Sequence, residues 1–251
     1  MKYWGMIVVN NKCAVVTGGS SGIGLVVCHK FLTNGYVVYN LDLKKNNDKK
    51  INTIICDVSQ ENQVIRAVDE IKKHNSEIEV LVNCAGIFCD KVRGEIFSIP
   101  IEEWNKVINV NLTGVFLVSK YFVPLLMKSK HDVSIVNISS DQAIYQKAGG
   151  GPYGISKAAV SALTKTLAKD LVKYGIRVNE VAAASVRTNF INKYFNERNM
   201  NVDEIYNKMA QQMPFGLIEP GAIANAVYWL SSEDAKNITG QTLLIDSGYL
   251  L

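Results

Sequence analysis

The segment Thr17-Gly18-Gly19-Ser20-Ser21-Gly22-Ile23-Gly24 follows the apolar run Cys13–Thr17 and opens a stretch with helical periodicity, Gly22–Thr33. A glycine-rich motif between a strand and a helix indicates phosphate binding. Glycine permits close backbone approach, and the helix N-terminus presents amides and partial positive charge to a pyrophosphate. The alternative is a tight turn without a ligand, which the flanking elements make the weaker interpretation. The residues predicted to contact a dinucleotide are Gly18, Ser20, Ser21, Gly22, Ile23 and Gly24.

Two aspartates follow the next apolar runs. Asp42 ends the second run, 24 positions after Gly18, where a carboxylate can accept hydrogen bonds from a ribose and repel a 2′-phosphate. This predicts NAD rather than NADP, although Lys44 and Lys45 are placed where an ammonium could hold a phosphate. Asp57 follows the third run, and its spacing fits a turn or helix-capping aspartate as well as a contact with adenine.

Short β-branched runs alternate with longer helical patterns along the chain. Continuously apolar strands are typical of a parallel sheet that is buried on both faces. The alternation predicts right-handed crossovers and a doubly wound, mostly parallel, seven-stranded α/β sheet with helices on both faces, a Rossmann fold. We expect residues 1–251 to form a single dinucleotide-binding and catalytic domain. The predicted strands are Cys13–Thr17, Tyr36–Asp42, Asn52–Cys56, Glu79–Asn83, Asp132–Ser139, Ile176–Val181 and Thr242–Asp246, and the predicted helices are Gly22–Thr33, Gln60–His74, Ile101–Lys128, Pro152–Tyr174 and Pro220–Ser231.

Composition narrows the class of protein. With 48% hydrophobic and 20% charged residues among 251, the chain is too apolar to be disordered, and a net charge of +4 without clustering argues against a nucleic-acid partner. No run approaches the ~18 uninterrupted apolar residues of a membrane span, and the N-terminus lacks a secretory signal pattern. Five cysteines in apolar runs indicate a reducing compartment, so we expect a cytoplasmic protein. The dispersed His29, His74 and His131 predict no metal site.

Tyr153 and Lys157 lie four residues apart on a predicted helix and therefore project from one face. The pair alone is weak, but Ser140 follows the fifth strand, and ligands of open α/β sheets bind at the carboxyl ends of strands. Hydride transfer from an alcohol requires a proton to leave the same oxygen. A phenol has a pKa of about 10, which a nearby ammonium lowers toward a useful value.

Seven segments, in order, resemble the motifs of the short-chain dehydrogenase/reductase family. They cover nearly the whole chain, from Asn11 to Gly248. The resemblance implies an oxidoreductase that transfers a hydride between NAD(H) and a secondary alcohol or ketone. The matching segments are TGGSSGIG (Thr17–Gly24), CDV (Cys56–Val58), NCAG (Asn83–Gly86), NVNLTG (Asn109–Gly114), NISS (Asn137–Ser140), YGISK (Tyr153–Lys157) and TGQTLLIDSG (Thr239–Gly248).

The resemblance also implies residue roles. Tyr153 is expected to act as general acid/base, Lys157 as its electrostatic partner and ribose ligand, and Ser140 as the group that holds the substrate oxygen. Asn111, which we favour over Asn109 because it precedes Leu112 as in the family's N-L pair, completes a water-mediated proton relay. The family further implies a homotetramer built on the Tyr153 helix and its neighbour. Gln142 is expected to border the substrate pocket, and further cofactor contacts are expected from Asp42, Asp57, Val58, Asn83, Ala85, Gly86 and Thr188.

Two segments depart from the pattern or leave it open. Ala183-Ala184 stand where the family usually has Pro-Gly, which predicts a less rigid turn beside the nicotinamide. Residues 189–216 are rich in aromatic residues and methionine, and they fit a mobile substrate lid, two small helices packed on the core, or both. The small substrate is expected to have an apolar body. The alternatives to a redox enzyme are a catalytically silent dinucleotide sensor or scaffold, and an epimerase or lyase without net redox change.

Overall fold

The computed structural model describes residues 12–88, 95–196 and 199–251. Seven strands form one sheet in the order β3-β2-β1-β4-β5-β6-β7, and every pair in it is parallel. This confirms the predicted doubly wound Rossmann architecture, and the predicted strands lie within one or two residues of the observed ends. The strands are β1 (Cys13–Thr17), β2 (Val37–Asp42), β3 (Asn52–Ile55), β4 (Val80–Asn83), β5 (Val133–Ser140), β6 (Ile176–Ala183) and β7 (Thr242–Ile245).

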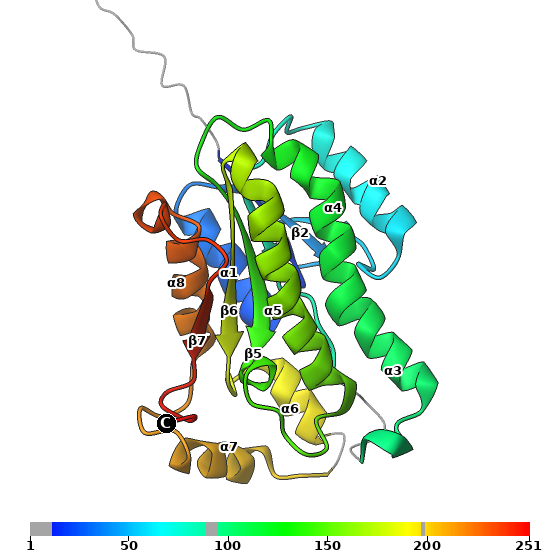
Figure 1. Cartoon of the computed structure of the whole chain (residues 1–251), viewed down its shortest axis with the longest axis vertical. Helices are drawn as coiled ribbons and strands as arrows, with labels where there is room; N and C mark the ends of the chain where they lie inside the picture. The colour runs from blue at the N-terminus through cyan, green and yellow to red at the C-terminus, as the bar shows by residue number, and fades with distance from the viewer. Residues whose placement is uncertain (1–11, 89–94, 197–198) are drawn as a thin grey trace, which may run out of the picture.

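Helices cover both faces of the sheet (Figure 1). On one face α1 (Gly22–Thr33) and α8 (Pro220–Leu230) pack side by side and bury the even-numbered side chains of β1. On the other face lie α2 (Glu61–Lys72), α4 (Gly114–Leu126) and α5 (Gly151–Leu171). Because every strand runs in the same direction, all seven carboxyl ends lie at one edge of the sheet.

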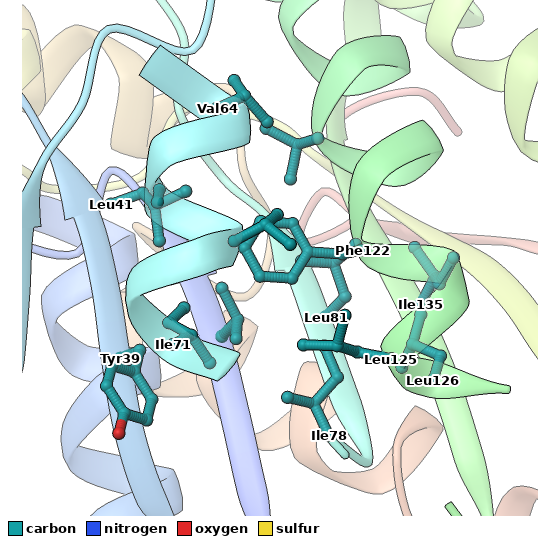
Figure 2. Close-up of a cluster of buried hydrophobic side chains, with 14 of the residues drawn as sticks. Tyr39, Leu41, Val64, Ile71, Ile78, Leu81, Phe122, Leu125, Leu126 and Ile135 are labelled. Atoms are coloured by element: carbon teal, nitrogen blue, oxygen red, sulfur yellow. The ribbon is translucent and has the colours of Figure 1, made fainter. Parts of the chain in front are cut away.

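The second face carries a dense apolar core. Figure 2 shows Phe122 of α4 lying between Ile71 of α2 and Leu81 of β4. These three side chains are fully buried. Burial of each contributes about 1.5–3 kcal/mol before the entropy of ordering the chain is counted. This core fixes α2 and α4 on the sheet and leaves the strand ends free to form a site.

The predicted helix Ile101–Lys128 is interrupted. It consists of α3 (Ile101–Ile108), a π-helical turn (Asn109–Thr113) and α4. The Asn111 side chain in this turn is fully buried. It accepts a hydrogen bond from the Ile87 amide at 2.8 Å and donates one to the Ile87 carbonyl at 2.9 Å. Periodicity alone cannot reveal such a turn, because a π-bulge changes the helix by a single residue.

The run Ile101–Leu126 is also the one helical segment, among the described residues, that is long and apolar enough to cross a membrane, with a mean hydropathy of 1.3. A core helix of a globular protein meets the same criterion. Here Val118, Phe122 and Leu125 are fully buried against the sheet and α2, so the apolar side chains serve the interior.

Residues 189–216 contain two short helices, α6 (Asn189–Asn196) and α7 (Val202–Gln211). Phe195, Tyr206 and Met213 are buried, so much of the segment's apolar surface packs inward, as one of the two predicted alternatives requires. Residues 197–198 and the side chains of residues 189, 190, 193 and 194 lie outside the described part of the chain.

Candidate active site

A cavity of about 540 Å³ lies at the carboxyl ends of the strands. It is bordered by Gly18 after β1, Asp42 at the end of β2, Gly86 after β4, Ser140 at the end of β5 and Thr188 after β6. Its volume is within the range of about 300–1,000 Å³ that cofactor sites occupy. Other predicted site residues that line it are Ser21, Gly22, Ile23, Gly24, Asp57, Val58, Ala85, Gln142, Tyr153 and Lys157.

The glycine-rich loop is shaped by close backbone approach. A Cβ on Gly24 would lie 2.3 Å from the carbonyl oxygen of Gly18, and Gly18 itself has φ +72°. Ser21 precedes α1 without capping it through its side chain, and the first turn of α1 carries no acidic residue. The amides at this helix end therefore face the cavity with their positive partial charge, which suits the pyrophosphate of a dinucleotide.

A buried asparagine on β2, which the sequence pattern did not single out, braces this loop. The Asn40 Oδ1 accepts a hydrogen bond from the Gly19 amide at 2.7 Å, and its Nδ2 donates to the Ser20 Oγ at 2.9 Å. The Asp42 carboxylate accepts from the amides of Ser20 at 3.0 Å and Lys44 at 2.9 Å. The Ser20 hydroxyl is thus turned toward β2, Ser20 is not among the residues that line the cavity, and its contact with a cofactor stays a prediction. In the sequence, the feature that could have indicated Asn40 is its position as a polar residue inside an apolar strand.

Asp57 lies in the loop between β3 and α2. Asp57 accepts hydrogen bonds from the amide and the hydroxyl of Ser59 at 2.9 and 2.7 Å, so it stabilises the turn before α2. Asp57 and Val58 also line the cavity. Both hydrogen bonds go to Oδ1, so the turn role is present in the structure, and a contact of Asp57 with adenine stays a prediction.

Asn83, which is predicted to contact the cofactor, lies in the interior at the end of β4. Asn83 is buried and is not among the lining residues of the cavity. Its amide donates to Asn137 Oδ1 at 2.8 Å and to Ser119 Oγ at 3.2 Å. The Asn83 Nδ2 therefore ties β4 to β5 and α4, whereas its buried Oδ1 has no hydrogen-bond partner among the described residues.

Three predicted catalytic side chains lie at the same end of the cavity. Ser140 Oγ is at the end of β5, and Tyr153 and Lys157 project from the first turns of α5. The Lys157 Nζ lies 5.8 Å from the centroid of the Tyr153 ring and donates to the Ile138 carbonyl at 2.9 Å. The ring of Phe88 packs on Tyr153 at a centroid distance of 4.2 Å.

Burial shifts the acid–base properties of this pair in opposite directions. Burial raises the pKa of Tyr153 above its ordinary value, while a hydrogen bond from Ser140 acts to lower it and the charge of Asp141 to raise it. Burial lowers the pKa of Lys157 to about 8. In both cases the low-dielectric interior disfavours the charged form. A phenolate and an ammonium side by side would each relieve this penalty for the other.

Asn111 lies close to this pair but is occupied elsewhere. A Cβ on Gly86 would lie 3.4 Å from both Asn111 Oδ1 and Lys157 Nζ, which places the two on one side of Gly86. The Asn111 amide bonds Ile87, and its Nδ2 also donates to Ser156 Oγ at 3.1 Å. Its neighbours Asn109 and Val110 line the cavity, whereas Asn111 does not.

The substrate end of the cavity has a charged wall that the sequence patterns did not indicate. The buried Asp141 accepts from Ser140 Oγ at 2.8 Å and forms a 3.0 Å ion pair with Lys147. The ammonium of Lys147 also lies 4.6 Å from the ring centroid of Tyr249. Both charged residues line the cavity together with Gln142. In the sequence, the feature that could have indicated Asp141 and Lys147 is an acidic and a basic residue six positions apart in the loop after Ser140.

The turn at Ala183-Ala184 is held by its neighbours. The Ala184 amide donates to the Ile245 carbonyl at 3.0 Å, and both alanines are buried and line the cavity. The predicted loss of rigidity is thus offset by pairing with β7. Thr188, a few residues on, lines the cavity as expected.

The described cysteines are free, and Cys89 lies outside the described residues. Cys13, Cys28 and Cys56 are buried in the core. Cys84 lines the cavity, and burial raises the pKa of its thiol to about 12, so it is neutral at pH 7. In the described part of the chain, no three His, Cys, Asp or Glu side chains gather as metal ligands.

Comparison with known proteins agrees with this geometry. A sequence model for the family described as Enoyl-(Acyl carrier protein) reductase matches residues 18–250. The chain is 32% identical to a 3-oxoacyl-(acyl-carrier-protein) reductase of Thermotoga maritima, covering 97% of this chain and 99% of that protein. It is 31% identical to glucose 1-dehydrogenase 2 of Bacillus subtilis, covering 97% and 96%.

Solved structures show the same relationship in three dimensions. The aldohexose dehydrogenase of Thermoplasma acidophilum superposes with a TM-score of 0.90 at 34% identity, covering 96% of this chain and 94% of that one. Membership of one family explains the parallel sheet, the ordered sequence motifs and the cavity geometry of this chain together. The chain belongs to the short-chain dehydrogenase/reductase family of oxidoreductases.

Proposed function

We propose that the protein transfers a hydride between NAD(H) and a small secondary alcohol or ketone, with Tyr153 as general acid/base. The observation that carries the proposal is that Ser140, Tyr153 and Lys157 line one cavity with the glycine-rich loop. A bound nicotinamide dinucleotide would accept or supply the hydride. The loop amides, the ends of β2 and β4, and Thr188 offer the polar groups that such a ligand requires.

Each side chain has a task at the substrate oxygen. Ser140 holds the oxygen by a hydrogen bond, and Tyr153 receives the hydroxyl proton during oxidation or returns it during reduction. Lys157 stabilises the phenolate through its positive charge. Phe88 and the wall of the cavity exclude water from the pair, which strengthens these electrostatic interactions.

The relay role predicted for Asn111 falls to its main chain. Its side-chain amide already bonds Ile87 and Ser156, so it has little capacity left for a water. A π-helical turn alters the hydrogen bonding of the main chain around Asn111. A water between the Asn111 carbonyl and Lys157 would carry the proton away from the site.

Asp42 favours NAD over NADP. Its carboxylate stays at the end of β2, braced by the amides of Ser20 and Lys44, and lines the cavity. A 2′-phosphate at that place would meet a fixed negative charge.

The charged wall points to a substrate with polar groups beside the reacting carbon. Asp141 accepts hydrogen bonds and Lys147 donates them, which together suit neighbouring hydroxyl groups. Phe88 and Ile191 add apolar surface, which suits the carbon skeleton of such a substrate as well as the apolar body first expected. The glucose and aldohexose dehydrogenases among the similar proteins carry such substrates in their names.

A homotetramer and a cytoplasmic location are part of the same proposal. Phe116 on α4 and Ile155 on α5 are exposed apolar side chains on the helices implied for assembly. Sedimentation equilibrium of the purified protein would test the tetramer, and a monomer at micromolar concentration would contradict it.

One assay tests the function. The protein is incubated with NAD and a panel of aldohexoses, polyols and simple secondary alcohols. Formation of reduced nicotinamide is followed by its absorbance at about 340 nm. We expect reduction with at least one polyhydroxylated alcohol. NAD binding without reduction would support the silent sensor. Substrate conversion without accumulated reduced cofactor would support an epimerase or lyase.

A further inference from the structure

Glu180 on β6 is a fully buried carboxylate in the middle of the parallel sheet, with 0% of its surface exposed. In the strand register it lies opposite Asn137 of β5 and Thr242 of β7. The roles assigned so far to the site do not use it. An ionised group in the interior is strongly destabilising unless polar partners surround it, so this position requires an explanation.

Three hydroxyl groups surround the Glu180 carboxylate. Ser139 and Ser161 donate to Oε1, the latter at 2.6 Å, and Thr242 donates to Oε2 at 3.1 Å. They come from β5, α5 and β7. Three hydroxyl donors around one buried carboxylate stabilise negative charge on its oxygens. No ion pair that the structure describes includes Glu180, so the charge has no cation in direct contact.

These hydroxyls belong to the segments that hold Lys157. Ser161 is one helical turn after Lys157 on α5 and also lies 3.4 Å from its carbonyl. The Lys157 Nζ donates to the carbonyl of Ile138, and Ser139 is the next residue of β5. Glu180 therefore joins the helix turn that carries the ammonium to the strand that receives its hydrogen bond.

We propose that Glu180 is a positioning residue for the hydride-transfer reaction, whose buried carboxylate, clamped by Ser139, Ser161 and Thr242, keeps Lys157 in place and protonated. This inference rests on the proposed function. The carboxylate acts through Lys157 and touches neither substrate nor cofactor.

The charged groups around Lys157 indicate which one favours its protonated form. Burial lowers the pKa of Lys157, and the charges of Cys84 and Glu180 act to raise it. The Cys84 thiol, after β4, is neutral at pH 7 because its pKa is about 12. Tyr153 lies on the same helix, and Asp141 acts on Tyr153 rather than on Lys157. Among the described residues, Cys84 and Glu180 are the groups whose charges act on the ammonium, and since the thiol is neutral this influence falls to Glu180.

The substitution Glu180→Gln keeps the shape and removes the charge. The ammonium should then lose its proton roughly one pH unit earlier, as expected for one charge removed at moderate distance inside a protein. The active form needs a Tyr153 phenolate beside a protonated Lys157. At low pH its population depends on Tyr153 alone, so kcat/KM for alcohol oxidation should match the wild type there. At high pH, where kcat/KM no longer rises, one of the two groups has lost a proton. In Glu180→Gln that group is more often Lys157 than Tyr153, so kcat/KM there should be about tenfold lower than in the wild type. The apparent pKa of the pH profile should fall by roughly one unit.

A second readout does not depend on turnover. The titration of Lys157 is followed by NMR of protein labelled with ¹³Cε-lysine, and its signal is assigned by its absence in Lys157→Met. We expect the midpoint of Lys157 to fall roughly one pH unit in Glu180→Gln and to stay near the wild-type value in Glu180→Asp, which keeps the charge. If the protein shows no redox activity at all, this titration still decides whether Glu180 controls Lys157.

Thr242→Val provides a variant with a milder effect on folding. It removes one hydroxyl that stabilises the carboxylate, so the Lys157 midpoint should move in the same direction by a smaller amount. An unchanged Lys157 midpoint in both folded variants overturns the proposal. A fall of kcat/KM by the same factor at every pH, with the midpoint unmoved, assigns Glu180 a purely structural role and also overturns it. If Glu180→Gln does not fold, the result for Thr242→Val decides.

Discussion

The ammonium of Lys157 is anchored on the main chain of β5, where it donates a 2.9 Å hydrogen bond to the carbonyl of Ile138. This contact places the charge two residues before Ser140 and beneath the Tyr153 ring, although the helix and the strand belong to separate parts of the sequence. The site therefore depends on how α5 packs on β5.

Tyr153→Phe should lower kcat by roughly 100- to 10,000-fold, because it removes the group that exchanges the proton with the substrate oxygen. Cofactor affinity, measured by NADH fluorescence titration, should change little, since the ring and its packing on Phe88 remain. Tyr145→Phe is the matched control, because Tyr145 is exposed on the loop before α5. Near-normal turnover by Tyr153→Phe would show that another group handles the proton.

Lys157→Met should abolish activity and yet raise the melting temperature at pH 7. The folded pKa of Lys157, about 8, lies below its ordinary 10.5, so between these values the unfolded chain binds more protons and stability rises with pH. Below pH 8 the full cost of burying the charge is present, on the order of 3 kcal/mol. Calorimetry from pH 6 to 10 should show a rise in the wild type that the variant lacks. Equal pH dependence in both proteins would contradict the shifted pKa.

Asp42→Asn should raise the affinity for NADP relative to NAD about tenfold, equivalent to about 1.4 kcal/mol. The amide can still accept a hydrogen bond from the loop, but it no longer repels a 2′-phosphate. Binding constants for both cofactors are measured by calorimetric titration. Asp48→Asn, on the same segment, serves as the control and should leave the ratio unchanged. A wild type that already prefers NADP would refute the role given to Asp42.

Lys147→Met should raise the KM of polyhydroxylated alcohols about tenfold while KM for a simple secondary alcohol changes less. The substitution leaves the buried Asp141 without its 3.0 Å partner and removes a donor from the charged wall. Steady-state kinetics with both substrate types give the comparison, and Lys49→Met is an exposed-lysine control. The same change in KM for both substrates would argue against a specificity role.

Gly24→Ala should weaken cofactor binding and lower the free energy of unfolding by about 1–3 kcal/mol, as overpacking does. Its Cβ would lie 2.3 Å from the Gly18 carbonyl oxygen, so α1 would be pushed away from the loop. Gly221→Ala is the control, because nothing lies within 4 Å of a Cβ there. Urea unfolding and NADH titration measure the two effects. Unchanged values for Gly24→Ala would mean that the loop does not require this contact.

The sequence by itself determined the sheet, the glycine-rich loop and the identity of Ser140, Tyr153 and Lys157 as neighbours at one edge. These features are local or periodic, because strand and helix patterns repeat every few residues and the carboxyl ends of parallel strands must meet. The same reasoning placed Asp42 at the end of a strand, and the family resemblance implied Thr188; both line the cavity.

Only the tertiary structure decided what depends on packing between distant segments. It joined Asn83 to Asn137 in the core, and it engaged the Asn111 amide with Ile87. It also bonded Glu180 to Ser161, one helical turn after Lys157, and paired Lys147 with Asp141. Buried polar groups choose partners by three-dimensional proximity, which no spacing along the chain encodes, because the same residue type can cap a turn, bridge two strands or face a ligand.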